Sequence, residues 1–118
     1  MNNWLCIAAI NGALAVLCGA FAAHGLQGRL DAHALEIFQT GARYHMVHAV
    51  AMGLAALSGR PRARWAAGLF LAGIVLFSGS LYALALTGMT AFAYVTPVGG
   101  LAFVGGWIAL AFAARRTA

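Results

Sequence analysis

The sequence contains no lysine, and Asp31 and Glu36 carry its only side-chain carboxylates. Charged residues make up 8% of the chain, whereas about a quarter of the residues in an average soluble domain are charged. With so few charges the chain cannot cover a surface in water, which excludes a soluble domain. Hydrophobic residues account for 64% of the 118 residues, and the mean hydropathy is +0.89. We therefore predict an integral membrane protein, organised as a single transmembrane domain over residues 1–118.

The shortage of carboxylates also argues against an enzyme. A paired-acid mechanism would need both carboxylates to converge on one substrate, but Asp31 is expected in a loop outside the membrane. A serine hydrolase would need a serine activated by a histidine and an acid. Ser80 and His24 could meet, but no nucleophile elbow surrounds the serine. The sequence therefore predicts a non-enzymatic protein without catalytic residues.

Cysteine is scarce, and the basic residues are not arranged for nucleic acid. Cys6 and Cys18 belong to one apolar run and would lie about 18 Å apart along a helix. They cannot pair with each other and are interpreted as buried thiols. The net charge of +5 suits anionic lipid headgroups, whereas nucleic-acid binding would need a basic face with stacking aromatics on a soluble module. We expect membrane lipids, and no nucleic acid, as partners.

What the sequence does contain is long apolar runs. A membrane-spanning helix needs about 20 mostly apolar residues, and residues 4–23, 37–57, 65–86 and 92–114 meet this length. Apolar and polar residues do not alternate as they do in a membrane β-barrel, so helices are expected to satisfy the backbone inside the bilayer. The first run is interpreted as a span and not as a signal peptide, because it lacks a basic start and exceeds the usual apolar length. The predicted fold class is all-α, with four transmembrane helices.

The arginines predict the orientation of these helices. Because the links are short, neighbouring spans should pack antiparallel as an up-down bundle, which brings both termini and the link after residue 57 to one side. Five of the seven arginines belong to this side: Arg60, Arg62, Arg64, Arg115 and Arg116. On the other side, Arg29 is offset by Asp31 and Glu36. The positive-inside rule then places both termini in the cytoplasm.

Polar side chains gather in the outer half of this predicted bundle. If the second span begins near Ile37, Arg43 lies about 9 Å below the outer boundary of the hydrocarbon core. The third span runs outward and brings its polar residues to a similar depth, where the first span ends and the fourth begins. The candidate ligand-binding or network residues at this level are His24, Glu36, Gln39, Arg43, Ser78, Ser80, Tyr82 and Thr96. In the inner half, Asn11 is the main polar residue, near the depth of His48.

Two interpretations of this outer cluster remain open. In the first, its side chains hydrogen-bond one another and fix the order of the helices, although such contacts average only about 0.6 kcal/mol. In the second, Arg43 recognises a charged ligand in an outward-facing pocket, which would explain an arginine that costs about 2.5–3.5 kcal/mol at the bilayer centre. Arg43 could also snorkel to the outer headgroups.

Pairs of small residues at helical spacing are typical of tight helix contacts in membranes. The pairs are Gly12 with Gly19, Gly68 with Ala72, and Gly99 with Gly106. They fit contacts within one chain as well as a homo-oligomer or a larger membrane complex. Together with the small size of the chain, they favour a non-enzymatic structural or interaction protein. The alternative function is binding or transport of a small anion or lipid headgroup at the pocket around Arg43.

The four histidines do not form a recognisable metal or haem site. His45 and His48 are three residues apart and could share an ion, but a metal site would need a third ligand and second-shell acceptors. Axial haem ligands normally come from facing helices, and His24 and His48 lie at different depths. We therefore predict no cofactor and no metal, and expect the ring nitrogens to bond to neighbouring backbone or to tyrosine.

Four motifs in order carry a family resemblance: "GAFAAHGL" at 19–26, "FQTGARYHMVHA" at 38–49, "LFSGSLYALALTG" at 76–88 and "TPVGGLAFVGGW" at 96–107. Together they resemble the membrane-protein family of unknown function numbered 423, which is related to transmembrane protein 256. The resemblance covers nearly the whole chain and implies a four-helix protein of the bacterial inner membrane, without implying an activity. The chain departs from the family pattern at Ala22, His45 and Val47. Residues that match the pattern, and are candidates for that reason, are His24, Arg43, Tyr44 and His48.

Overall fold

The computed structural model describes residues 3–115 and is all-helical, as predicted. Arg116 and the chain termini, on which part of the orientation prediction rests, lie outside the described residues. The helical elements, in chain order, are α1 (Asn3–Ala20) with the π-helix η1 (Phe21–Gly25), α2 (Ala32–Leu57), α3 (Ala63–Gly73), the π-helix η2 (Ile74–Ser78), α4 (Gly79–Thr87), the 3-10 helix η3 (Thr90–Tyr94) and α5 (Thr96–Ala114). Because α3, η2 and α4 follow one another without a break, they form a single helix over Ala63–Thr87.

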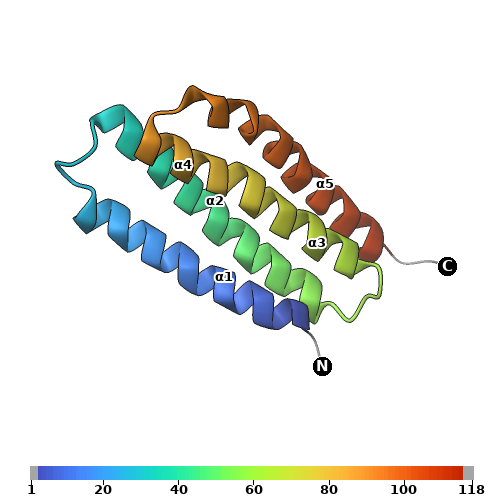
Figure 1. Cartoon of the computed structure of the whole chain (residues 1–118). Coiled ribbons are helices and arrows are strands. Elements are labelled where there is room, and N and C mark those ends of the chain that lie inside the picture. Colours follow the sequence, from blue (N-terminus) through green and yellow to red (C-terminus); the bar gives the residue numbers. More distant parts are fainter. Residues whose placement is uncertain (1–2, 116–118) are drawn as a thin grey trace.

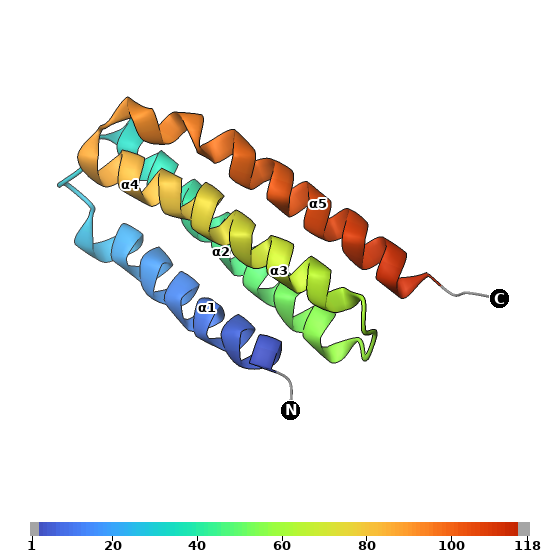
Figure 2. The ribbon, with the colours of Figure 1, turned by 45° about the vertical axis from the view of Figure 1, so that its right-hand side comes forward.

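The long helices lie side by side in a flattened bundle. Figures 1 and 2 show α2 between α1 and the α3–α4 helix, and α5 on the other side of α3–α4. The link between α2 and α3 lies at the same end as the start of α1 and the end of α5, and the other two links lie at the opposite end. The Cα atoms extend over 55 × 26 × 17 Å.

Three helices are long and apolar enough to cross a membrane: Asn3–Gly25, Ala63–Thr87 and Thr90–Ala114. They coincide with three of the four predicted spans. The second predicted span belongs to α2, which is longer than the others but does not reach the same hydropathy because it carries histidine, glutamate and arginine. The polar content of α2 therefore has to be explained by where its side chains point.

The helix α2 also begins five residues before the apolar run that predicted it. Asp31 caps its first turn, where the carboxylate Oδ1 accepts a hydrogen bond from the backbone N–H of Ala34 at 2.8 Å. An aspartate at this position satisfies backbone donors that have no partner within the helix. A hydropathy run identifies only the apolar part of a helix. The run from residue 37 therefore does not include the polar first turns of α2, residues 32–36, which Asp31 caps.

The core is built mainly of alanine around a few large side chains. Phe70 and Met52 are fully buried, and Phe103 and Ile74 join them in the main cluster. The rest of that cluster is alanine from α1, α2, α3 and α5: Ala8, Ala51, Ala55, Ala63, Ala66, Ala67 and Ala113. Small side chains allow helices to approach closely in membranes, so the bundle is narrow.

Glycine brings α5 against the α3–α4 helix. A Cβ on Gly99 would collide with the backbone of Phe77, and a Cβ on Gly106 would come within 2.6 Å of the Phe70 ring. The predicted role of these two glycines in tight packing is confirmed. By contrast, a Cβ on Gly12 or Gly19 would meet no described atom within 4 Å, so these two do not mediate a contact within the described chain.

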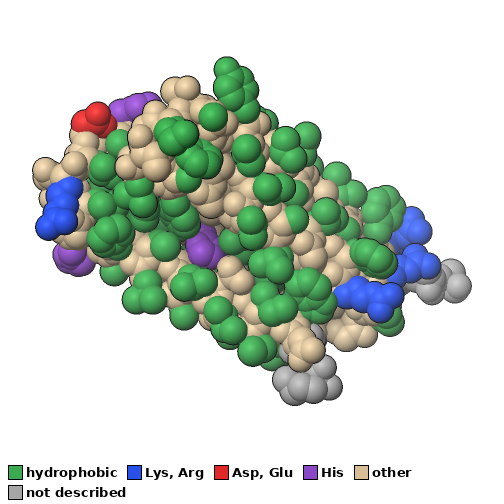
Figure 3. Space-filling model, viewed as in Figure 1, with side chains coloured by type: hydrophobic (Ala, Val, Ile, Leu, Met, Phe, Trp, Pro, Cys, Tyr) green, Lys and Arg blue, Asp and Glu red, His purple; other side chains and the backbone are tan. Residues whose placement is uncertain are grey.

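Charge is divided between the two ends of the bundle. Figure 3 shows arginine side chains gathered at the end where α1 starts and α5 finishes, a mixture of acidic, basic and histidine side chains at the opposite end, and hydrophobic side chains over most of the face between them. Arg60, Arg62, Arg64 and Arg115 are all exposed at the first of these ends. A largely apolar band between two charged ends is the surface that a bilayer requires, and among the described residues Arg43 is a charged side chain exposed within it.

Candidate functional site

The polar side chains of α2 point to opposite sides of the helix. Arg43 and His45 are two positions apart in the sequence, about 200° around a helix, so both cannot face the bundle interior. His45 and His48 are each only 4% exposed, whereas Arg43 is exposed. The structure therefore turns the histidines inward and leaves the arginine on the surface.

A hydrogen-bonded chain of three side chains joins α1, α2 and α4. The ring of His45 lies in its middle, with Nε2 3.0 Å from Oδ1 of Asn11 and Nδ1 3.0 Å from the hydroxyl of Tyr82. The amide nitrogen of Asn11 donates to the backbone oxygen of Ile7 at 2.9 Å, which directs Oδ1 toward the histidine. An amide oxygen can only accept, so Nε2 of His45 carries a proton, and in the neutral ring Nδ1 then accepts from the Tyr82 hydroxyl.

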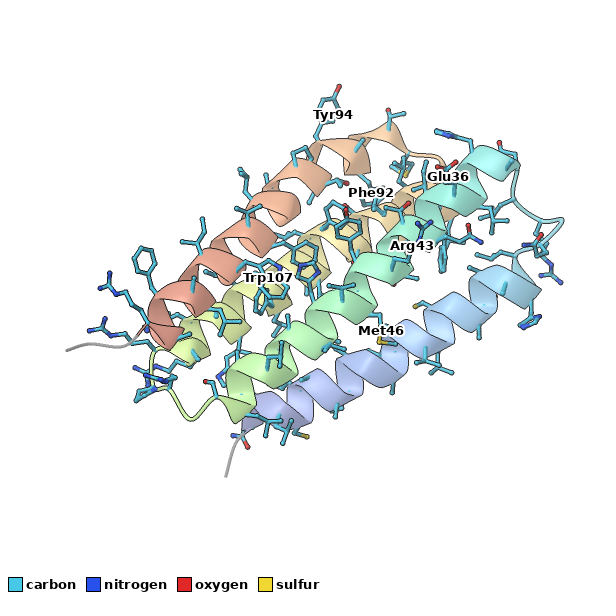
Figure 4. All side chains as sticks on the ribbon, turned by 180° about the vertical axis from the view of Figure 1, so that it is seen from behind. Glu36, Arg43, Met46, Phe92, Tyr94 and Trp107 are labelled. Atoms are coloured by element: carbon cyan, nitrogen blue, oxygen red, sulfur yellow. The ribbon has the colours of Figure 1, made fainter. Side chains whose placement is uncertain are left out.

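A second arrangement joins α2 to α5 through His48. Its Nδ1 lies 2.7 Å from the backbone oxygen of Tyr44, and its Nε2 accepts a hydrogen bond from the indole N–H of Trp107 at 3.1 Å. The ring also stacks on Phe103, with centroids 3.6 Å apart and planes at 9°. Figure 4 shows Trp107 reaching from α5 into the space between the helices. Because an indole only donates and a carbonyl only accepts, the proton of His48 lies on Nδ1.

His48 is neutral because its Nε2 accepts from Trp107, and a charged His45 ring would be costly in the buried interior. As neutral rings the two histidines are opposite tautomers, and both nitrogens of each ring are in use. The expectation that ring nitrogens bond to neighbouring backbone or to tyrosine is confirmed for His45 and His48. A metal ion could coordinate either ring only by displacing Tyr82 or Trp107 from its lone pair. Within residues 3–115, no three side chains of His, Cys, Asp or Glu lie close enough to hold a metal together.

Two serines of the α3–α4 helix differ in how their hydroxyls are satisfied. Ser80 Oγ lies 2.6 Å from Oγ1 of Thr96 and 2.9 Å from the backbone oxygen of Phe77, so it ties α4 to the start of α5. Ser78 is fully buried in η2, and its hydroxyl is without a hydrogen-bond partner among the described residues. An unpaired buried hydroxyl costs about 1–3 kcal/mol.

Arg43 lies in a hollow on the surface between α1 and α2. The hollow has a volume of about 620 Å³. Its lining residues are Ala15, Val16, Gly19 and Ala20 of α1 and Gln39, Ala42, Arg43 and Met46 of α2. Arg43 has no hydrogen bond or ion pair with any residue in the described range 3–115. Figure 4 shows Arg43 and Met46 along the side of α2 that borders α1.

The structure does not bring the predicted outer cluster together around Arg43. Gln39 shares its hollow, but Glu36 and His24 are exposed elsewhere toward the α1–α2 link. The remaining candidates belong to the bundle interior or its far side: Tyr44, His48, Ser78, Ser80, Tyr82 and Thr96. Arg43 is therefore not the centre of a protein network, and the interior polar groups form separate pairs and chains.

Sequence reasoning missed three residues that hold these interior contacts. In the sequence Asn11 stands alone among apolar residues, His45 departs from the family pattern, and Trp107 belongs to an apolar run without a polar neighbour. For Asn11 and His45 a signal existed, since each is a polar group in an apolar run and such groups need a buried partner. The indole of Trp107 gave no such signal, because tryptophan is equally at home at the membrane interface.

Known proteins resemble this chain over nearly its whole length. Residues 18–100 match the family described as "Protein of unknown function (DUF423)". The UPF0382 membrane protein YwdK of Bacillus subtilis is 44% identical, with 98% of each chain covered. A UPF0382 membrane protein of Haemophilus influenzae is 44% identical over 98% of this chain and 96% of its own. The UPF0382 inner membrane protein YgdD of Escherichia coli is 44% identical over 95% of this chain and 88% of its own. No solved structure matches the chain.

Proposed function

The chain belongs to the DUF423 family of membrane proteins, and on this basis we propose that it is a non-enzymatic structural or interaction protein of the bacterial inner membrane. One observation carries the proposal. The buried histidines, which would be the natural acid–base or ligand groups, have both ring nitrogens in hydrogen bonds within the bundle: His45 bonds to α1 and α4, and His48 bonds to its own helix and to α5. Groups committed to neighbouring helices stabilise the bundle and are not poised for chemistry. Function then lies on the outer surfaces of the bundle.

The proposed topology has four antiparallel crossings with both termini in the cytoplasm. Support comes from the exposed arginines at the end of the bundle that holds the α2–α3 link, since positive charge is retained on the cytoplasmic side. The inward-facing histidines support α2 as a fourth crossing, because they remove most of its polarity from lipid. Reporter fusions after Arg115 and in the link 88–89 should report opposite compartments. Reports from the same compartment would contradict the topology.

The surface best suited to a protein partner is the outer ridge of α5. This ridge is exposed and apolar, and consists of Leu101, Val104, Ile108 and Phe112. A photo-cross-linking residue at Leu101 should capture a protein of defined mass in native membranes, either a second copy or another membrane protein. The same residue at Leu17 on α1 tests the opposite side of the bundle. Capture of lipid alone at both positions would count against an interaction protein.

One observation favours a second function, the binding of an anion or lipid headgroup. Arg43 is a charged side chain at membrane depth without a protein partner in the described range. Intramembrane charges of this kind are commonly functional. The hollow between α1 and α2 in which Arg43 lies restricts the kind of anion that can bind there.

A further inference from the structure

Two hollows lie one after the other along one side of the contact between α1 and α2. The hollow that contains Arg43 lies between residues 15–20 of α1 and 39–46 of α2. A second hollow, of about 340 Å³, lies between residues 5–12 of α1 and 49–57 of α2. The lining positions of both hollows recur at intervals of three and four residues on each helix, so they occupy a single stripe. Because they follow one another along this stripe, the two hollows are together called the groove, with the hollow of Arg43 as its part nearer the α1–α2 link.

The groove is charged at one end and apolar along the rest. Its inner part is lined only by leucine, valine, alanine and glycine. Gly12 of α1 and Gly53 of α2 both line this part, and a Cβ on either would meet no described atom within 4 Å. From Arg43 to Leu57 the groove follows α2 for about 21 Å, longer than the roughly 15 Å of one leaflet of the hydrocarbon core.

Arg43 lies at the depth where a lipid phosphate can be reached. The opposing residue Ala20 is five positions before the end of η1 at Gly25, about 8 Å along the helix axis. An arginine side chain can span most of that distance toward the headgroups. A guanidinium matches the geometry of phosphate with two parallel hydrogen bonds. The groove thus combines an anion-binding side chain, Arg43, with an apolar part that is long enough for an acyl chain.

We propose that this groove binds one phospholipid, with Arg43 on its phosphate and an acyl chain lying over Gly12 and Gly53. A helix of a second copy of this chain is a less suitable occupant of the groove, because it brings no negative charge to the level of Arg43. The only carboxylates available on that copy are Asp31 and Glu36, and Glu36 is seven residues, about 10 Å, nearer the headgroups than Arg43. In a copy inserted with the same orientation, neither carboxylate reaches the level of the arginine.

The proposal is tested by lipid retention of the purified full-length protein. The protein is reconstituted with equal amounts of phosphatidylglycerol and phosphatidylethanolamine, returned to mild detergent, and weighed by native mass spectrometry. We expect one retained phospholipid on the wild type and about tenfold less on Arg43→Gln, the loss that corresponds to one charge-assisted contact. Arg29→Gln removes the same charge outside the groove and should retain lipid like the wild type. Diacylglycerol, which lacks the phosphate, should not be retained.

A second variant tests the apolar part of the groove independently of the charge. Gly53→Leu places a side chain in open space within the groove, so it should fold with a melting temperature at or above that of the wild type and lose phospholipid about tenfold. Ala13→Leu, exposed on α1 outside the groove, is its matched control and should retain lipid. If Arg43→Gln fails to fold, Gly53→Leu decides the question.

Three results would overturn the proposal. They are no retained phospholipid on the wild type, equal retention by Gly53→Leu and Ala13→Leu, and a dimer whose second chain occupies the groove. The inference rests on the second proposed function, the binding of an anion or lipid headgroup at Arg43, and is separate from the structural or interaction role. Cross-linking at Leu101 reports on the ridge of α5, so a negative result there leaves the lipid groove intact, and the reverse also holds.

Discussion

The indole nitrogen of Trp107 donates a hydrogen bond to Nε2 of His48 across the interface between α2 and α5, at 3.1 Å. This contact fixes the tautomer of His48, because the other ring nitrogen faces a backbone oxygen. It also ties α5 to the helix that carries most of the polar residues of the chain. Because such contacts occupy the buried polar groups, those groups are not free to bind a ligand.

Trp107→Phe should destabilise the protein by about 1–3 kcal/mol, because it leaves a buried ring nitrogen without its donor. The change keeps an aromatic ring at the same position. The free energy of unfolding in mixed micelles measures the effect. Trp65→Phe is the control, since Trp65 is exposed at the start of α3, and it should be close to neutral. Equal effects of the two changes would show that the indole hydrogen bond does not stabilise the bundle.

The chain from Asn11 through His45 to Tyr82 should behave as one unit. Asn11→Leu and Tyr82→Phe each remove one partner of the histidine, although the two residues do not contact each other in the chain of hydrogen bonds. A double-mutant cycle should give a coupling of about 0.5 kcal/mol or more, as expected within one network. Unfolding free energies that add within about 0.3 kcal/mol would indicate two independent contacts.

Neighbouring glycines of α5 should respond in opposite ways to alanine. Gly99→Ala places a Cβ against the backbone of Phe77, where nothing can yield easily, while a Cβ on Gly100 would lie 3.8 Å from the Phe77 ring. We expect Gly99→Ala to lower the melting temperature strongly or to prevent folding. Gly100→Ala should be neutral or stabilising by up to about 1 kcal/mol through helix propensity. Similar melting temperatures for Gly99→Ala and Gly100→Ala would show that α5 does not pack against the α3–α4 helix at Gly99.

Ser78→Ala should be neutral or stabilising, which is unusual for a fully buried position. The hydroxyl has no partner among the described residues, so its removal relieves a desolvation cost of about 1–3 kcal/mol and leaves no other group unpaired. Ser80→Ala is the contrast, because it breaks the 2.6 Å contact with Thr96 and should destabilise. A large loss of stability for Ser78→Ala would reveal a partner for that hydroxyl.

The sequence was sufficient to predict the helices, because the apolar runs and the scarcity of charge have no other solution in a bilayer. It also identified the close packing at Gly99 and Gly106. Depth along each helix could be estimated from the run boundaries, and depth was the basis on which polar residues were grouped around Arg43.

Rotation about the helix axis could not be obtained in the same way, and it decides which residues meet. Arg43 and His45 are at nearly the same depth but on opposite sides of α2, so depth alone does not decide which of the two faces the interior. The π-helices at Phe21–Gly25 and Ile74–Ser78 add to the difficulty, because each changes the residue spacing within its helix. Their positions carry no clear sequence signature.

The central claim is that two neutral histidines of opposite tautomers close the polar interior of the bundle. Side-chain nitrogen NMR of histidine-labelled protein in lipid nanodiscs tests it most directly, with His45→Gln and His48→Gln used to assign the signals. The account predicts a proton on Nε2 of His45 and on Nδ1 of His48, each in a single fixed tautomer. An imidazolium signal, or rapid exchange between tautomers at either position, would contradict it.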